Sequence, residues 1–387
     1  MTIKIDVKFL IGLAVGALVA AGLVILFTSG GGGDDSKKTS ADGRISPAPQ
    51  GGGDQGGDQG SGDGDGGGDG GAGGGAQAGA PLTLPVPDGG GKVACPKPTK
   101  TVGDANSLQQ ALKGAQAGDV IRMNPGKYVG KFVATASGTQ QQPIFLCGEQ
   151  GSVIDGGGVK KGYGFHLDKA NYWRLIGFTV QNSQKGVVGD TTNGSVIQGL
   201  NVHDIGDEGI HVRDFSTGNT IQYNKIFNTG LRREKFGEGV YLGTAQSNFK
   251  SVSGGKVDNS DNNVVRGNVI RATAEAIDIK EGTKGGKILN NVFDGSRTGG
   301  DKHNDSWVDV KGNGYLIEGN KGDKTPADGF QVHQIINGWG TGNTFRNNTI
   351  NLDGGKGVGI NDTVGGNTIA CNNKVTGGRL TAKGKCS

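Results

Sequence analysis

A short apolar strand that ends in Gly or Asn recurs along the chain between Trp173 and Lys374. Within each repeat apolar and polar residues alternate, as in 264–270, and this period of two is typical of a strand buried on one face. Helical spacing is nearly absent from this stretch. The turn positions that close the repeats are separated by steps of 22, 25, 44, 23, 29, 28 and 25 residues and are Gly177, Gly199, Asn224, Asn268, Asn291, Asn320, Asn348 and Asn373.

Repeats of this length that contain only strands predict a solenoid. One coil cannot bury its apolar face alone, so neighbouring coils must stack in parallel and share one long core. The predicted fold class is therefore all-β, a single-stranded parallel β-helix. We interpret the column of Asn residues as part of the scaffold, because Asn tolerates left-handed backbone and can hydrogen-bond to the next coil.

Two segments of different composition precede the repeats. Residues 9–27 form an uninterrupted run of 19 apolar or Gly residues behind Lys4 and Lys8, which predicts a single-pass membrane anchor over residues 1–29. A cleaved signal peptide is the alternative. Residues 30–91, rich in Gly and Asp, predict a disordered linker. The β-helix domain is then expected over residues 92–387, on the extracellular side of the membrane or secreted.

The start of this domain contains a different pattern. Residues 104–119 predict a short capped amphipathic helix that ends at a Gly and covers the open end of the first coil. Four cysteines agree with export, because two local disulfides at the solenoid ends would prevent fraying. They lie as one pair near each end of the domain: Cys95 with Cys147, and Cys371 with Cys386.

Charge separates the folded part from the linker. The linker carries nine Asp against three basic residues, whereas the whole chain has a formal charge of +4, so the folded part is net positive. A basic extracellular domain favours an anionic polysaccharide as partner. No nucleic-acid motif or dense basic stripe is present, so nucleic acid is not expected, and the chain is expected to act as a monomer.

The second strand of each coil predicts where chemistry lies. Each such strand carries two apolar residues, two positions apart, that are expected to face the core, and the residues interleaved with them then point outward. The expected inward pairs are Phe165/Leu167, Ile210/Val212, Val240/Leu242, Ile277/Ile279, Val308/Val310, Phe330/Val332 and Val358/Ile360. The expected outward pairs are His166/Asp168, His211/Arg213, Tyr241/Gly243, Asp278/Lys280, Asp309/Lys311, Gln331/His333 and Gly359/Asn361.

Because coils are roughly 4.8 Å apart, these outward residues are expected to form one continuous stripe. A second, acidic row is expected beside it, since carboxylates stand just before the same strands: Glu208, Glu238, Glu275 and Asp328. One interpretation is that these charges merely neutralise one another on a solvated face. The other is a groove that binds and cleaves a glycan.

The opening of the domain resembles a known family. Ala117-Gly118-Asp119-Val120-Ile121, Pro125-Gly126-Lys127-Tyr128, Ser137-Gly138-Thr139 and Pro143-Ile144 resemble the opening of pectate-lyase-like right-handed β-helix proteins, most of all the branch of chondroitinase B and related alginate lyases. The resemblance covers about residues 95–387 and implies a right-handed β-helix. It further implies a polysaccharide lyase with a Lys base, an Arg acid and carboxylate-bound calcium. The nearest match to that motif is Glu275 to Gly282, in which Lys280-Glu281 stands in place of Lys-Ser.

The stripe and the resemblance together predict β-elimination on a uronate-containing polymer. Lys280, expected to be exposed, and Lys311 are the candidate bases, because a Lys flanked by other cations can titrate low enough. Arg213, His211 and His333 are expected to assist. Possible Ca²⁺ ligands are Glu238, Glu275 and Asp278, with Glu208. The residues expected to contact substrate are Tyr241 and Trp307 by stacking, Asp309 and Gln331 on the stripe, and Arg232 and Arg233 on a neighbouring loop.

Two other function classes remain open at the level of sequence. A glycoside hydrolase would use Asp278 and Asp309 as its acid and base, although one coil of separation is short for an inverting enzyme. A non-catalytic glycan-binding or adhesive surface protein would suit an anchor and a long linker equally well.

Overall fold

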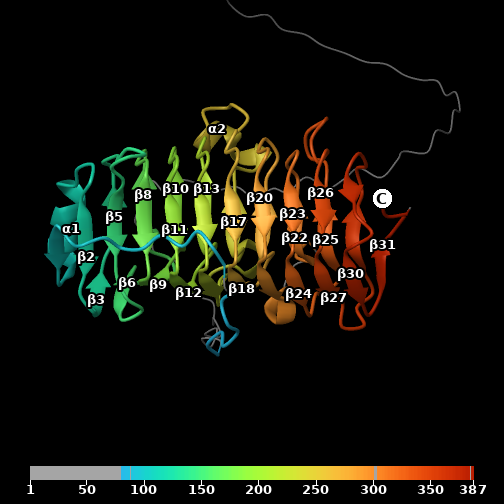
Figure 1. Ribbon diagram of the computed structural model, residues 1–387, viewed down its shortest axis with the longest axis horizontal. Coiled ribbons are helices and arrows are strands. Elements are labelled where there is room, and N and C mark those ends of the chain that lie inside the picture. Colours follow the sequence, from blue (N-terminus) through green and yellow to red (C-terminus); the bar gives the residue numbers. More distant parts are fainter. Residues whose placement is uncertain (1–79, 88, 300–302, 384) are drawn as a thin grey trace, which may run out of the picture. The chain divides into compact units, whose positions relative to one another are not determined.

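The computed structural model describes residues 80–387 except 88, 300–302 and 384. The described chain is a parallel β-helix, whose successive coils stack along one axis (Figure 1). Every strand pair is parallel and joins neighbouring coils, as the repeat pattern predicts. Three long sheets run the length of the stack, and we refer to them as sheets A, B and C.

Sheet A contains the first strand of each coil. Its central strands carry an apolar residue in the middle position, such as Ile197 and Ile221, which pair in register across coils. In spatial order it consists of β1 (Lys100–Val102), β2 (Val120–Met123), β5 (Ile144–Cys147), β8 (Trp173–Ile176), β11 (Val196–Gln198), β14 (Thr220–Gln222), β17 (Val264–Arg266), β20 (Lys287–Leu289), β23 (Leu316–Glu318), β26 (Thr344–Arg346) and β29 (Thr368–Ile369).

Sheet B follows sheet A after a tight turn that holds Gly or Asn. In spatial order it consists of β3 (Gly126–Val129), β6 (Ser152–Asp155), β9 (Thr179–Ser183), β12 (Asn201–Ile205), β15 (Lys225–Phe227), β18 (Val269–Arg271), β21 (Val292–Asp294), β24 (Lys321–Asp323), β27 (Thr349–Asn351) and β30 (Lys374–Thr376).

Sheet C carries the predicted stripe. In spatial order it consists of β4 (Phe132–Ala134), β7 (Tyr163–Asp168), β10 (Lys185–Asp190), β13 (Ile210–Arg213), β16 (Val240–Leu242), β19 (Ile277–Ile279), β22 (Ser306–Val310), β25 (Asp328–Val332), β28 (Val358–Asp362) and β31 (Arg379–Thr381). Short helices interrupt the loops that border it, namely η1 (Glu234–Phe236), η2 (Gln246–Asn248), α2 (Phe249–Val252) and η3 (Gly295–Arg297).

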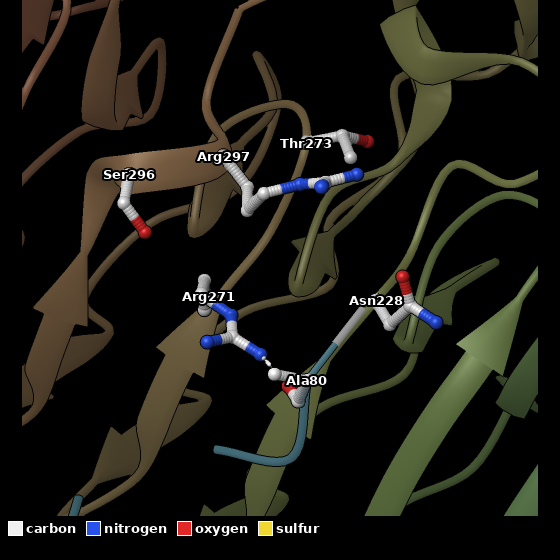
Figure 2. Close-up of a pocket in the computed structure, with 6 residues that line it drawn as sticks. All are labelled: Ala80, Asn228, Arg271, Thr273, Ser296 and Arg297. Carbon is white, nitrogen blue, oxygen red and sulfur yellow. Dashed lines mark hydrogen bonds between the residues drawn. The ribbon is translucent and has the colours of Figure 1, made fainter. Parts of the chain in front are cut away.

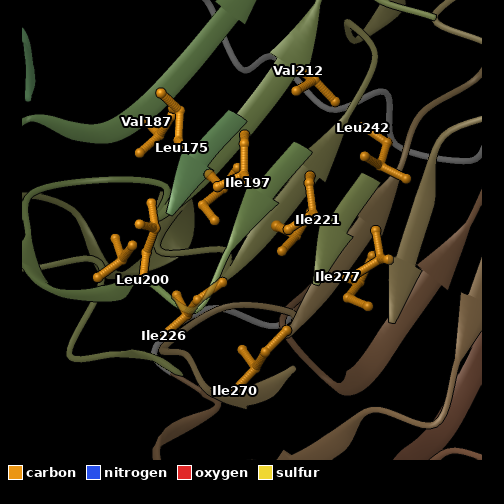
Figure 3. Close-up of a cluster of buried hydrophobic side chains, with 14 of the residues drawn as sticks. Leu175, Val187, Ile197, Leu200, Val212, Ile221, Ile226, Leu242, Ile270 and Ile277 are labelled. Carbon is orange, nitrogen blue, oxygen red and sulfur yellow. The ribbon is translucent and has the colours of Figure 1, made fainter. Parts of the chain in front are cut away.

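The core fills the space between the three sheets. Apolar side chains from all three sheets meet there in successive layers, and their burial is the main driving force for stacking (Figure 3). Members of this cluster are Leu175, Ile197 and Ile221 from sheet A, Ile226 and Ile270 from sheet B, and Val212, Leu242 and Ile277 from sheet C.

A helix covers the first coil, and a disulfide lies near each end of the stack. Helix α1 (Ala105–Lys113) buries Leu108 and Leu112 over the first coil, starts at the predicted N-cap Asp104 and ends at Gly114. Both predicted disulfides are present, Cys95–Cys147 at the first coils and Cys371–Cys386 at the last. They indicate an oxidising, extracellular compartment.

The predicted Asn column is a hydrogen-bonded ladder between the turns of sheets A and B. In each step the amide oxygen of one Asn accepts from the backbone N–H of the Asn in the preceding coil, for example Asn268 Oδ1 from Asn224 N at 2.9 Å. The predicted column is wrong by one residue in the first coils. The prediction placed Gly199 level with Asn224, but in the structure Leu200 occupies that position and its N–H donates to Asn224 Oδ1. The members are Asn224, Asn268, Asn291, Asn320, Asn348 and Asn373.

Removal of one ladder side chain is expected to destabilise the solenoid strongly. Asn268→Ala leaves the buried Asn224 N–H without its acceptor, at about 1–3 kcal/mol, and also removes the amide donor to the Ile221 carbonyl, so we expect a loss of about 1–3 kcal/mol. Chemical denaturation measures this loss. Asn259→Ala, at an exposed position, is the matched control and should change the free energy of unfolding by less than about 0.5 kcal/mol. Equal effects of the two substitutions would contradict the ladder's role.

The folded part begins earlier than the sequence predicts. Leu82 packs with Phe227 and Val269 of sheet B, and Gln198 and Gln222 bind backbone groups of Val93 and Gly91. The described residues between Ala80 and Cys95 thus form a strap along the outside of the coils (Figure 1). The predicted linker therefore ends near residue 80, because its last part contains apolar residues that find partners on the solenoid.

The predicted membrane anchor over residues 1–29 and most of the predicted linker lie outside the described residues. In the part of the chain that the structure describes, no helix has the length and hydropathy needed to cross a membrane.

Candidate functional site

The predicted stripe exists as a column of facing residues on the outer face of sheet C. His211, Tyr241, Asp278, Asp309 and Gln331 lie opposite one another in consecutive strands from β13 to β25. All five are buried, with at most 8% of their surface exposed. The stripe is therefore a closely packed polar layer and not a row of solvated surface charges.

The centre of this layer is a continuous chain of ion pairs. The Asp278 carboxylate bridges two ammonium groups, with Lys280 Nζ 2.8 Å from Oδ2 and Lys311 Nζ 3.0 Å from Oδ1. Lys311 Nζ also lies 2.7 Å from Asp309 Oδ2, and Asp309 Oδ1 lies 2.9 Å from His333 Nδ1. The structure thus brings together both predicted lysines, both stripe aspartates and one predicted histidine. We call these five residues the ion-pair chain.

The electrostatics of the lysines differ from the sequence prediction. Burial opposes the charged form of Lys280, but the negative charges of Asp278 and Glu281 outweigh it and raise its pKa well above the usual range. Burial is likewise outweighed at Lys311, where Asp278 and Asp309 raise the pKa. The expectation of exposed lysines with lowered pKa values is wrong, because carboxylates and not cations are their nearest neighbours. Both lysines are ammonium ions at neutral pH.

Asp309 and His333 form a charged pair at one end of the ion-pair chain. Burial would raise the pKa of Asp309, but the charge of Lys311 and the hydrogen bond with His333 lower it. The hydrogen bond to Asp309 is the main cause of the raised pKa of His333. Asp309 is therefore a carboxylate at neutral pH.

A buried acidic triad lies beside the ion-pair chain. Ligand oxygens of Glu238, Glu275 and Asp278 all lie within 4.8 Å of one another. Burial raises the pKa of Glu238 well above its usual value, and the charges of Glu208 and Glu275 add to this effect. Burial and the charge of Asp278 do the same for Glu275. Glu238 Oε2 is buried without a hydrogen-bond partner.

The triad contains three of the four predicted metal ligands, and Glu208 is not among them. Glu208 Oε1 lies 3.1 Å from Lys185 Nζ and 3.5 Å from His211 Nδ1. Burial would raise its pKa, but the charge of Lys185 and the hydrogen bond with His211 lower it. The Glu208 carboxylate therefore forms an ion pair with Lys185 of β10 and does not join the triad.

Two rings border the ion-pair chain on its other side. The rings of His211 and Tyr241 lie 4.3 Å apart, and Lys280 Nζ lies 5.0 Å from the Tyr241 ring centroid. His211 Nε2 donates to the Gly243 carbonyl at 2.9 Å, since a carbonyl only accepts. Burial lowers the pKa of His211, whereas burial and the charge of Asp278 raise the pKa of Tyr241. At neutral pH the imidazole and the phenol are both uncharged.

The predicted arginines lie around this centre in ion pairs of their own. Arg213 lies on β13, two strands before β19 in sheet C. Its Nε donates to Asp190 Oδ1 at 2.8 Å. Arg232 Nε donates to Asp207 Oδ1 at 3.0 Å, and Arg233 lies 3.7 Å from the same carboxylate. All three therefore pair with aspartates that are not members of the ion-pair chain.

The structure contradicts the prediction that Trp307 stacks against a sugar. Its side chain is fully buried in the core, where the ring packs against Phe293 and Phe330. The prediction assumed strict alternation along β22, but both Trp307 and its neighbour Val308 point inward at the start of that strand. Gly322 and Gly329 provide the space for the indole. Gln331 remains on the stripe, bound to Asp328 at 2.9 Å.

Two parts of the predicted register differ in the structure. Ile360 rather than Val358 pairs with Phe330, so Asn361 lies opposite Gln331. Strand β10, with Lys185 and Asp190, lies between β7 and β13 and was missing from the predicted stripe. The strand was missed because Gly189 occupies one of its two inward positions, where the pattern requires an apolar side chain. Val187, at the other inward position, was the one residue of the pair that could have indicated the strand.

One solved structure decides the family. An alginate lyase from Paenibacillus sp. str. FPU-7 is similar to this chain with a TM-score of 0.70 and 36% sequence identity, over 74% of this chain and 98% of that one. The chain belongs to the pectate-lyase-like right-handed β-helix family. The resemblance found in the sequence is thereby confirmed, and the fold is that of the polysaccharide lyase β-helices.

Other comparisons support the same family at the level of fold. The family model described as Pel9A-like, right handed beta helix region matches residues 97–238. Pectate lyase Pel9A is similar with a TM-score of 0.54 and 15% identity over 74% of this chain and 82% of that one. PfbA, a surface adhesin of Streptococcus pneumoniae, is similar with a TM-score of 0.53 and 12% identity over 73% and 75%. No curated protein matches the chain.

Proposed function

We propose that this β-helix is an extracellular polysaccharide lyase that cleaves a uronate-containing polymer by β-elimination, with alginate as the first polymer to test. The observation that carries the proposal is the 36% identity to an alginate lyase over 98% of that enzyme's chain. The packed layer of cations, carboxylates and rings on sheet C supports it, because those groups suit an acidic sugar and proton transfer.

The reaction makes three chemical demands. The uronate carboxylate must be neutralised, a base must remove the proton at C5, and the C4–O bond must break as the C4=C5 double bond forms. The departing oxygen takes up a proton. A site for this reaction therefore needs cations, a proton acceptor and a proton donor within reach of one sugar ring.

The burial and ion pairs of the groups on sheet C assign these tasks differently from the sequence prediction. As ammonium ions, Lys280 and Lys311 suit neutralisation of the carboxylate and donation to the departing oxygen, not proton abstraction. His211 lies beside Tyr241, with Nε2 donating to the Gly243 carbonyl and Nδ1 facing Glu208. We propose it as the base in the other tautomer, in which Nδ1 donates to Glu208 and Nε2, released from Gly243, accepts the C5 proton. Tyr241, a phenol at neutral pH, is a second donor candidate.

The acidic triad fits a divalent cation. Calcium takes several oxygen ligands, and three buried carboxyl groups, two of which form no ion pair among the described residues, match this preference. Glu238 Oε2, which lacks a hydrogen-bond partner, would gain one in the ion. Glu238, Glu275 and Asp278 would hold Ca²⁺, which would supply positive charge to the carboxylate side of the substrate.

The hydrolase alternative is less suited to this geometry. Asp278 and Asp309 are direct neighbours in β19 and β22, and Lys311 binds both. A hydrolase needs one of its two carboxyls protonated, with a raised pKa, yet the pKa of Asp309 is lowered by Lys311 and His333 despite burial. A binding protein without activity remains an outcome of the test below.

A panel of acidic polymers tests the proposal. The full chain is incubated with alginate, pectate, hyaluronan and chondroitin, with added Ca²⁺ or with chelator, and the ultraviolet absorbance of the unsaturated ends is followed. We expect absorbance to rise with alginate and to fall on chelation. New reducing ends without that absorbance would mean hydrolysis. Retention on a polymer column without any product would mean binding alone, and either result would overturn the proposal.

A further inference from the structure

A cleft beside sheet B carries two arginines and is lined by other residues than the polar layer of sheet C, the proposed catalytic groove. Its volume is about 210 Å³, and it lies where strands of sheet B turn toward sheet C. Figure 2 shows the side chains surrounding an open space. Arg271 ends β18, Asn228 follows β15, and Ser296 and Arg297 belong to η3. The full lining is Ala80, Asn228, Arg271, Thr273, Ser296 and Arg297, none of which belongs to sheet C.

Positive charge in this cleft is not compensated by the described chain. Arg271 donates to the Ala80 carbonyl of the strap, and its guanidinium carbon lies 5.8 Å from the Phe227 ring centroid. Among the described residues no carboxylate lies within ion-pair distance of Arg271 or Arg297, although most other arginines of the solenoid have such a partner. Two guanidinium groups that share a cleft repel each other, and a bound anion relieves this repulsion.

The rest of the lining is rigid and polar. Asn228 and Thr273 are 6% and 5% exposed, and each is held by hydrogen bonds to neighbouring coils. Thr273 Oγ1 binds the carbonyls of Thr229 and Glu234, which fixes the wall between the cleft and the loop over η1. Hydroxyl, amide and carbonyl groups next to two guanidiniums suit a ligand that carries both hydroxyls and a carboxylate. A sugar acid has this composition, and the cleft volume suits a single sugar unit.

The cleft lies close to the acidic triad along the chain. Thr273 lines the cleft, and Glu275, two residues further, belongs to the acidic triad. Two residues of extended chain span at most about 7 Å, so a polymer held in the cleft stays next to the groove. This proximity makes the cleft useful to an enzyme that acts on a long chain.

We propose that this cleft is a second binding site for a uronate unit of the polymer, outside the catalytic groove, with Arg271 and Arg297 binding the carboxylate. The identity of the ligand rests on the proposed function, whereas the presence of an anion site does not. The site tethers the polymer near the groove through bidentate guanidinium contacts. It raises the affinity for long chains and leaves the chemical step unchanged.

Calorimetric titration of the full chain with the substitution Lys280→Arg, which keeps the charge and is expected to be inactive, tests the site without cleavage. Short alginate oligomers are expected to bind at two sites per chain, and the further substitutions Arg271→Gln and Arg297→Ala should remove one of them. The matched control is Arg346→Ala with Arg379→Ala, which removes the same charge from exposed positions elsewhere. Unchanged stoichiometry in the cleft variant, or an equal loss in the control, would refute the proposal. Inorganic sulfate that displaces the oligomer at equal concentration would also refute it, by showing a generic anion site.

Kinetics in the otherwise unmodified chain give an independent measurement. The cleft variant should show a KM for polymeric alginate about tenfold higher or more, because charge-assisted hydrogen bonds are lost, with kcat unchanged. Thermal unfolding checks that the cleft variant is folded. If the double variant is unstable, Arg297→Ala alone is used, because it keeps the bond between Arg271 and the Ala80 carbonyl of the strap. An unchanged KM together with lyase activity would contradict the second binding site and leave the proposed function intact. Oligomer binding in the cleft without lyase activity would contradict the proposed function and support the second binding site.

Discussion

Lys280→Ala is expected to reduce β-elimination by about 100- to 10,000-fold, the range typical of a lost proton-transfer group. The substitution removes the ammonium that lies beside both Asp278 and the Tyr241 ring. It also leaves one Asp278 oxygen without its ion pair in a buried cluster that already has an excess of carboxylates, so the melting temperature should fall as well. The measurement is kcat/KM on alginate together with thermal unfolding.

Lys280→Arg separates chemistry from stability. Arg keeps the positive charge and the contact with Asp278, so the melting temperature should return to near the parent value. Activity should stay low, because a guanidinium does not exchange protons near neutral pH. Lys287→Ala, an exposed lysine of β20 on sheet A, is the control for loss of one charge and should leave both quantities unchanged. Full activity in Lys280→Arg would show that Lys280 acts through charge alone.

The repeat pattern predicts the fold because each coil obeys the same local rules. Alternation along the strands determines which residues face the core, and the Asn turns set the register from coil to coil, as in Asn224 and Asn268. The same periodicity places His211, Tyr241 and Asp278 in one column. A stripe of functional side chains on a solenoid is therefore accessible from sequence alone.

The features that sequence reasoning missed depend on contacts across coils. The pKa of Lys280 is raised by the nearby charges of Asp278 and Glu281. The spacing of residues in the sequence does not show how closely these side chains pack. Trp307 points inward because Gly322 and Gly329, in other strands, leave room for it. The strap depends on pairing of Val93 with Gln198 over 105 residues of sequence separation, which no local pattern reveals.

Calcium is expected to stabilise the domain through the acidic triad. An ion that binds only the folded state adds about 2.7 kcal/mol at a concentration 100 times its Kd. In chelator Lys280 and Lys311 pair with Asp278, whereas burial and neighbouring negative charge disfavour the ionised forms of Glu238 and Glu275, which a bound ion would stabilise. Thermal unfolding of the full chain in Ca²⁺ and in chelator should therefore give clearly separated melting temperatures.

Glu275→Gln should reverse the order of stability between the two conditions. The amide is isosteric and uncharged, so in chelator it relieves repulsion with Asp278, and the variant should melt above the parent. In Ca²⁺ it offers a weaker ligand, so the variant should melt below the parent and lose lyase activity with it. Glu318→Gln, an acidic residue on sheet A that binds Arg346, controls for the change of charge and should respond to Ca²⁺ as the parent does. If Ca²⁺ raises the melting temperature of Glu275→Gln as much as that of the parent, the ion binds elsewhere, and the triad is a site of shared protons between buried carboxyls.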